Sequence, residues 1–68
     1  MEMLKNYRQF RGLTRESLAT MVGISTETLA RYERGEREPT TTTTKKLAAA
    51  LNVTPNELLG VEAQEKEV

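Results

Sequence analysis

The stretch TRESLATMVGISTETLARYERG, residues 14 to 35, contains two short helical patterns separated by a glycine. Thr14 and Ser25 each stand where a helix cap is expected, and Gly23 is placed to end the first helix with a positive φ. The second pattern is apolar on one side, with Leu29 and Tyr32, and polar on the other, with Thr26, Glu27, Arg31 and Arg34. Two helices joined by a tight turn are therefore predicted, and the second has a polar face that core packing does not require.

Helical patterns also account for the rest of the chain, and no alternation of apolar and polar residues indicates a strand. One helix is expected at about residues 2 to 11. Another starts at Thr40 or Thr41, because KKLAAALNV continues the helical spacing directly after the threonine run at 40 to 44. TPNELL marks a fifth helix, with a threonine cap, a proline at the first position and a glutamate three residues after the cap. The expected fold class is all-α, with five helices in residues 1 to 61.

The core is expected to form from apolar side chains at helical spacing on these segments. They are Tyr7, Leu18, Leu29, Tyr32, Leu47 and Leu51. The apolar side of the helix after Thr14 is expected to consist of Leu18, Ala19, Met21 and Val22. Phe10 falls beside the apolar stripe of the first helix, and the pattern leaves open whether the acidic end of the chain or a second subunit covers it.

The chain has 68 residues with no cysteine and no histidine, and its apolar runs are short. A disulfide framework, a Cys/His metal site and a membrane span are therefore excluded. The start, MEMLKNYRQF, lacks the basic and then continuously apolar pattern of a signal peptide, so a cytoplasmic protein is expected. A chain this short buries a modest core, and self-association is a way to add stability.

Charge is unevenly distributed along the sequence. The whole chain is neutral, with ten basic and ten acidic residues. Residues 62 to 68 carry three glutamates and one lysine, which leaves nine basic and seven acidic groups, a net of +2, in residues 1 to 61. We expect a weakly basic domain followed by an acidic, disordered tail at 62 to 68.

Two short helices joined by a turn at Gly23, the second with a polar outer face, form a helix-turn-helix. In that motif the second helix lies in the DNA major groove, and its N-terminal part contacts base edges. The segment GLTRESLATMVGISTETLARYERGEREP, together with LAAALNVTPNELL, resembles the phage-repressor and Cro-like (Xre-type) regulators over residues 3 to 60. The matching residues are Gly12, Leu13, Thr14, Leu18, Ala19, Gly23, Ser25, Glu33, Gly35 and Pro39. The resemblance implies a compact, lambda-repressor-like DNA-binding domain.

Three residues on the polar face match the base-contacting positions of these regulators: Thr26, Glu27 and Arg31. Their chemistry suits the role, because threonine can contact the thymine methyl, glutamate can accept from cytosine N4, and arginine can bind guanine O6 and N7. The alternative is an exposed ion pair between Glu27 and Arg31, which are four residues apart. Both can hold if the pair exists in the free protein and is exchanged for DNA contacts.

Other charged and hydroxyl residues are assigned supporting roles. The expected contacts to the DNA backbone are Thr14, Arg15, Ser25, Thr28, Arg34 and Arg37. For the last two arginines, and for Arg15, an exposed side chain without a partner is the alternative. Arg8 and Glu33 match residues that form an internal ion pair in such domains, and each puts a charge on an inward-facing stripe, where it requires a partner.

The leading functional hypothesis is a sequence-specific regulator that binds double-stranded DNA. The resemblance implies a repressor that binds a palindromic operator as a homodimer, with a dimer surface near the fifth helix at Leu58, Leu59 and Val61. The alternative hypothesis is a protein-interaction module of the same fold, antitoxin-like or coactivator-like, which the neutral net charge and acidic tail favour.

An enzyme is the least supported hypothesis. The chain has no histidine or cysteine, and Ser17 and Ser25 have no base partner for nucleophilic catalysis. No metal-ligand spacing and no glycine-rich phosphate loop is present, so no metal, cofactor or small-molecule ligand is expected.

Overall fold

The computed structural model describes residues 1 to 60, and the predicted acidic tail at 62 to 68 lies outside the described residues. Five helices follow one another and no strand occurs in residues 1 to 60. The helices are α1 (Leu4–Phe10), α2 (Arg15–Val22), α3 (Thr26–Arg34), α4 (Thr41–Leu51) and α5 (Pro55–Leu59). The prediction of an all-α fold with five helices is confirmed.

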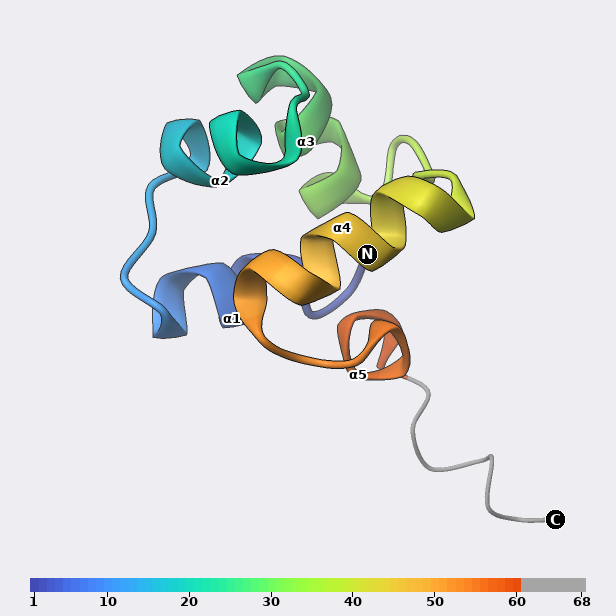
Figure 1. The fold of residues 1–68 in the computed structure, drawn as a ribbon. Coiled ribbons are helices and arrows are strands. Elements are labelled where there is room, and N and C mark those ends of the chain that lie inside the picture. Colours follow the sequence, from blue (N-terminus) through green and yellow to red (C-terminus); the bar gives the residue numbers. More distant parts are fainter. Residues whose placement is uncertain (61–68) are drawn as a thin grey trace, which may run out of the picture.

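Helix α4 crosses the middle of the domain, with α2 and α3 on one side and α1 and α5 on the other (Figure 1). It packs against α2 and α5, while α1 bridges the two sides by contacting α3 and α5. Helices α2 and α3 pack on each other and form the helix-turn-helix. This arrangement supports α3 from behind and leaves its outer side uncovered.

The core consists mainly of leucines from all five helices. The fully buried ones are Leu4, Leu18, Leu29, Leu47, Leu51 and Leu58. The prediction that Met21 belongs to the apolar side of α2 is wrong, because this residue is 57% exposed. Helix α2 buries Leu18, Ala19 and Val22, and at about 100° per residue the position before Val22 points away from that face.

Each of α2 to α5 is directly preceded by a cap residue. The side-chain oxygen of this cap accepts a hydrogen bond from the backbone amide three residues later. These caps are Thr14, Ser25, Thr40 and Thr54. Helix α1 has no such side-chain cap at Met3, and it is shorter than the expected span of residues 2 to 11. The turn between α2 and α3 is made by Gly23, whose φ of 82° places it in the left-handed region that a side chain disfavours.

Phe10 at the end of α1 lies on the surface, where the residue is 78% exposed. Its ring centroid is 5.5 Å from the guanidinium carbon of Arg11. Arg11 in turn donates from Nε to the carbonyl of Leu51 at 2.8 Å, which ties α1 to the C-terminal end of α4. Phe10 therefore flanks a structural arginine and adds nothing to the core.

Candidate nucleic-acid interface

The outer face of α3 carries the three residues expected to contact bases. Thr26, Glu27 and Arg31 are all exposed, while the opposite face of the helix is buried through Leu29, Ala30 and Tyr32. Arg31 donates to a carboxylate oxygen of Glu27 at 2.9 Å, one helical turn away. An exposed pair of this kind contributes only about 0.3 to 0.5 kcal/mol, so the two side chains are readily separated for other partners.

Hydroxyl groups cluster at the N-terminal end of α3. The Ser25 side chain accepts from the amide of Thr28 at 3.0 Å and donates to the Thr28 hydroxyl at 2.8 Å. The Thr28 hydroxyl makes no other hydrogen bond among residues 1 to 60. A hydroxyl donor at the positive end of a helix suits an anion such as a phosphate.

The N-terminal end of α2 repeats this arrangement. Thr14 accepts from the amide of Ser17 at 3.0 Å and donates to the Ser17 hydroxyl at 2.9 Å. Ser17 was not among the expected contacts, although the three-residue spacing from its cap is the same as that from Ser25 to Thr28. The same signal therefore identifies it as a further hydroxyl at a helix start.

Glu33, near the C-terminal end of α3, is the centre of a buried charge cluster. Its side chain is 3% exposed, and one carboxylate oxygen accepts from Arg8 Nε at 2.6 Å. Arg8 also donates to the carbonyl of Leu13 at 2.9 Å, which ties α1 to the residue before the cap of α2. The expected internal pair is thus present in the structure, with both partners hydrogen bonded.

The second oxygen of Glu33 lies 3.3 Å from Nε of Arg15, the first residue of α2. The Arg15 side chain is 43% exposed, and its two terminal nitrogens make no hydrogen bond within residues 1 to 60. Because Arg8 already neutralises Glu33, the positive charge of Arg15 is left without full compensation. The Arg15 guanidinium is therefore held by Glu33 through Nε, and its two terminal nitrogens remain available to another acceptor.

Arg34 at the end of α3 has a local partner that the sequence did not suggest. Its Nε and a terminal nitrogen bind the two carboxylate oxygens of Glu36 at 2.8 and 3.1 Å. The hydrogen bond from Arg34 lowers the pKa of Glu36, and the same bond raises the pKa of Arg34. Gly35 reverses the chain at φ 77° and so brings these side chains together. Arg37, in contrast, has no ion-pair partner among the described residues.

The three residues expected at a dimer surface have different environments. Leu58 is fully buried in the core, so its assignment to a subunit contact is wrong. Leu59 is 38% exposed and remains available on the surface. Val61 lies outside the described residues. The α5 helix is only five residues long, and just one of its two adjacent leucines can face the core.

No group of three or more acidic, histidine or cysteine residues that could hold a metal ion occurs within residues 1 to 60. In the same part of the chain, no helix is both long enough and apolar enough to cross a membrane.

A family model described as Helix-turn-helix (HTH_3) matches residues 4–58. The chain belongs to the HTH_3 family. It is 38% identical over 64 residues to the HTH-type transcriptional regulator ImmR of Bacillus subtilis (strain 168). The matched region covers 94% of this chain but only 50% of ImmR. It is 34% identical over 55 residues to YazB, an uncharacterized HTH-type transcriptional regulator of the same organism, over 81% of this chain and 80% of YazB.

A solved structure has the same architecture. The clp gene regulator ClgR from Corynebacterium glutamicum superposes with a TM-score of 0.80 at 25% sequence identity, over 94% of this chain and 68% of that one. The HTH_3 domain therefore has the DNA-binding fold of transcriptional regulators, which are not enzymes. Within this HTH_3 domain, α3 is the second helix of the motif, and its exposed face carries Thr26, Glu27 and Arg31.

Proposed function

We propose that the protein is a sequence-specific transcriptional repressor that binds a palindromic double-stranded operator as a homodimer, with α3 in the major groove. The observation that carries this proposal is the exposed face of α3. It presents a hydroxyl, a carboxylate and a guanidinium on a short helix whose other side is held by the core. These three groups distinguish base edges in the major groove, and the rigid support fixes their positions.

Backbone contacts are proposed on both sides of this face. Thr14, Ser25 and Thr28 offer hydroxyls at helix starts, while Arg15, Arg34 and Arg37 offer cationic groups. Arg34 must leave Glu36 to bind a phosphate. Since both of these side chains are more than half exposed, that exchange is inexpensive.

Repression and dimerisation follow the resemblance to phage repressors. In a dimer the two reading helices lie about one helical turn of DNA, roughly 34 Å, apart, so the operator is expected to have two-fold symmetry. Such a regulator acts in the cytoplasm, where its DNA is. A promoter fused to a reporter gene distinguishes repression from activation by the sign of the change when the protein is expressed.

A second candidate is a protein-interaction module of the same fold. It is favoured by the pairing of Arg31 and Arg34 with Glu27 and Glu36, which reduces the positive charge of the surface around α3. This candidate predicts weak DNA binding that hardly changes with salt, whereas an operator-binding regulator loses affinity steeply as salt rises.

The test is selection of binding sites from a random pool of duplex DNA, followed by anisotropy titration of the best site and a scrambled one at two salt concentrations. A palindromic consensus with salt-dependent affinity supports the regulator. Equal, weak binding to both duplexes would contradict it and favour the interaction module.

A further inference from the structure

The exposed face of α3 carries a carboxylate and a guanidinium that hold each other. Arg31 donates from one terminal nitrogen to a carboxylate oxygen of Glu27 at 2.9 Å. The bond uses one donor of the guanidinium, and the other donors make no hydrogen bond within residues 1 to 60. The second carboxylate oxygen of Glu27 has no partner in the same part of the chain. Both groups can therefore bind further partners while the bond between them stays closed.

The direction of this bond places the guanidinium near the N-terminal part of α3. Side chains on a helix lean toward its N-terminus, so Arg31 reaches back over the preceding turn to Glu27, the second residue of α3. In a helix-turn-helix, this N-terminal part contacts base edges. An arginine that is already held there has lost in advance some of the rotamer freedom that binding would otherwise remove.

A carboxylate on this face needs a cationic partner when DNA is near. Phosphates flank the major groove, so Glu27 without Arg31 would be repelled by them. In water the pair is weak, because its side chains are 48% and 73% exposed. An interface that excludes water lowers the local dielectric and strengthens the same bond. Opening the pair on DNA is thus unfavourable for Glu27, and keeping it closed leaves Arg31 enough donors for guanine O6 and N7.

We infer that Glu27 stays bonded to Arg31 on DNA and acts as its positioning residue. Arg31 then binds O6 and N7 of one guanine, while the free oxygen of Glu27 accepts from N4 of a cytosine in the adjacent base pair. Each half-site is expected to contain two consecutive G·C pairs at this point. In the opposite arrangement the pair opens, and the two side chains read bases independently. The inference rests on the proposed function and names the residue that sets the specificity of Arg31.

Base preferences distinguish a retained pair from an opened one. Anisotropy gives the affinity of the full chain for the selected operator and for every single-base change in one half-site. The proteins are the parent, Arg31→Ala, Glu27→Ala and the double variant, and circular dichroism verifies the helical fold of each. Arg31→Ala identifies the base pair that Arg31 reads. We expect Glu27→Ala to lower the preference at that same base pair about threefold to tenfold, and to have no further effect there once Arg31 is absent.

Glu27→Gln tests the bond itself. The glutamine amide oxygen can take the position of the lost carboxylate oxygen and still accept from Arg31. We therefore expect Glu27→Gln to keep more of the preference at the Arg31 base pair than Glu27→Ala keeps. Both variants remove the same negative charge, so equal preferences in the two would show an effect of charge alone and would contradict positioning through the bond.

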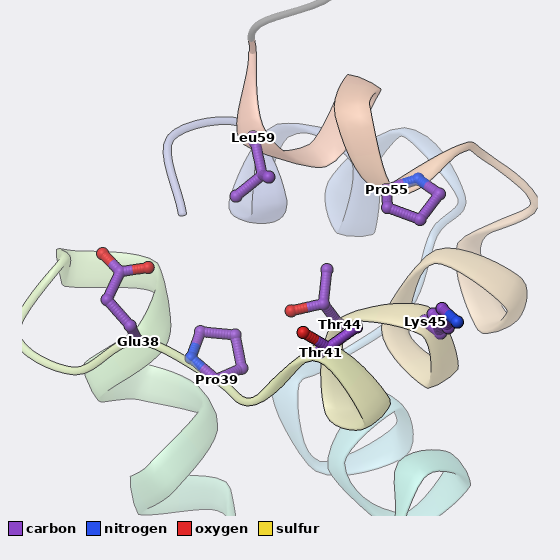
Figure 2. A pocket seen from close by; sticks show the side chains of 7 residues that line it. All are labelled: Glu38, Pro39, Thr41, Thr44, Lys45, Pro55 and Leu59. Atoms are coloured by element: carbon purple, nitrogen blue, oxygen red, sulfur yellow. The ribbon is translucent and has the colours of Figure 1, made fainter.

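Two other glutamates provide matched controls for the loss of a negative charge. Glu36 pairs with Arg34 at 2.8 Å beyond the end of α3, and Glu38 lies on the loop before α4, at one end of the groove in Figure 2. Neither carboxylate bonds to the Arg31 side chain in residues 1 to 60. Alanine at either position is expected to raise affinity for all duplexes alike, because a charge that repels phosphates is removed. A changed preference at the Arg31 base pair in these controls would overturn the inference.

The outcome is separable from that of the proposed function. A parent protein that selects a consensus, with a preference that Arg31→Ala loses and Glu27→Ala keeps, would overturn the inference and leave the regulator intact. The same holds if Glu27→Ala alters only a different base pair, because the two side chains then read separately. Equal, weak binding of the parent protein to all duplexes would overturn the inference together with the proposed function.

Discussion

Arg8 and Glu33 form a buried ion pair across the domain, with 2.6 Å between Arg8 Nε and a Glu33 carboxylate oxygen and with both side chains less than a tenth exposed. The two residues are 25 positions apart and belong to α1 and α3. The pair therefore fixes the end of α3 relative to α1. All buried polar atoms of the two side chains are hydrogen bonded, because no buried side-chain polar atom lacks a hydrogen bond in residues 1 to 60.

Removing either member of this pair should strongly destabilise the domain. Glu33→Ala leaves the Arg8 guanidinium buried without its counter-charge, which costs about 3 to 5 kcal/mol. Since small domains have a total stability of about 5 to 15 kcal/mol, this is a large share. Urea unfolding followed by circular dichroism measures the loss. Glu36→Ala, which removes an exposed partner, is the control and should leave stability nearly unchanged.

Arg15→Ala should affect DNA binding more than stability. Its bond to Glu33 is partly exposed, and the carboxylate keeps Arg8, so we expect a loss of less than about 1 kcal/mol in unfolding. If Arg15 also binds a phosphate, the slope of log affinity against log salt should become shallower by about 0.9. Anisotropy titrations at several salt concentrations measure this slope. A slope equal to that of the parent protein would restrict Arg15 to its contact with Glu33.

The adjacent leucines of α5 should behave differently when truncated. Leu58→Ala opens a cavity in the core and should cost about 2 to 5 kcal/mol of stability. Leu59→Ala should leave the unfolding free energy nearly unchanged but weaken the proposed dimerisation, because this residue is 38% exposed on the surface of α5. Sedimentation equilibrium and urea unfolding on both variants separate the effects. Equal loss of stability in the two variants would contradict the assignment.

Glu36 should titrate at a lower pH in the parent protein than in Arg34→Ala. The hydrogen bond from Arg34 stabilises the ionised carboxylate, so the folded pKa is depressed. The stabilisation is therefore present above the unfolded pKa and is lost as the pH falls through the folded value. Carboxyl carbon chemical shifts followed against pH measure both proteins. Identical titrations would show that the Arg34 contact is absent in solution.

Local signals predicted most of the fold. Thr14, Ser25 and Thr54 could be identified as caps from their own sequence neighbourhood, and Gly23 from the need for a positive φ at the turn. The threonine run at 40 to 44 belongs to α4, as expected, because apolar residues at helical spacing follow it directly. These features depend only on contacts within a few residues.

The features that the sequence did not predict depend on tertiary packing. Arg15 and Glu33 are 18 positions apart, and only the packing of α2 on α3 brings them together. The choice between Leu58 and Leu59 depends on the rotation of a one-turn helix, which two adjacent leucines do not define. The outward orientation of Met21 has the same origin, since the packing of α2 against α3 and α4 selects the face with Leu18, Ala19 and Val22.

Base discrimination by Arg31 most directly tests whether α3 reads DNA through its exposed face. Affinities of the parent protein and Arg31→Ala are measured for the selected operator and for every single-base change in one half-site, beside Arg37→Ala as a control for a backbone contact. Arg31→Ala is expected to lose preference at one base pair, by about 1 to 3 kcal/mol, while Arg37→Ala is expected to weaken binding to all sites equally. If Arg31→Ala keeps the parent preference at every position, α3 does not read DNA through this face.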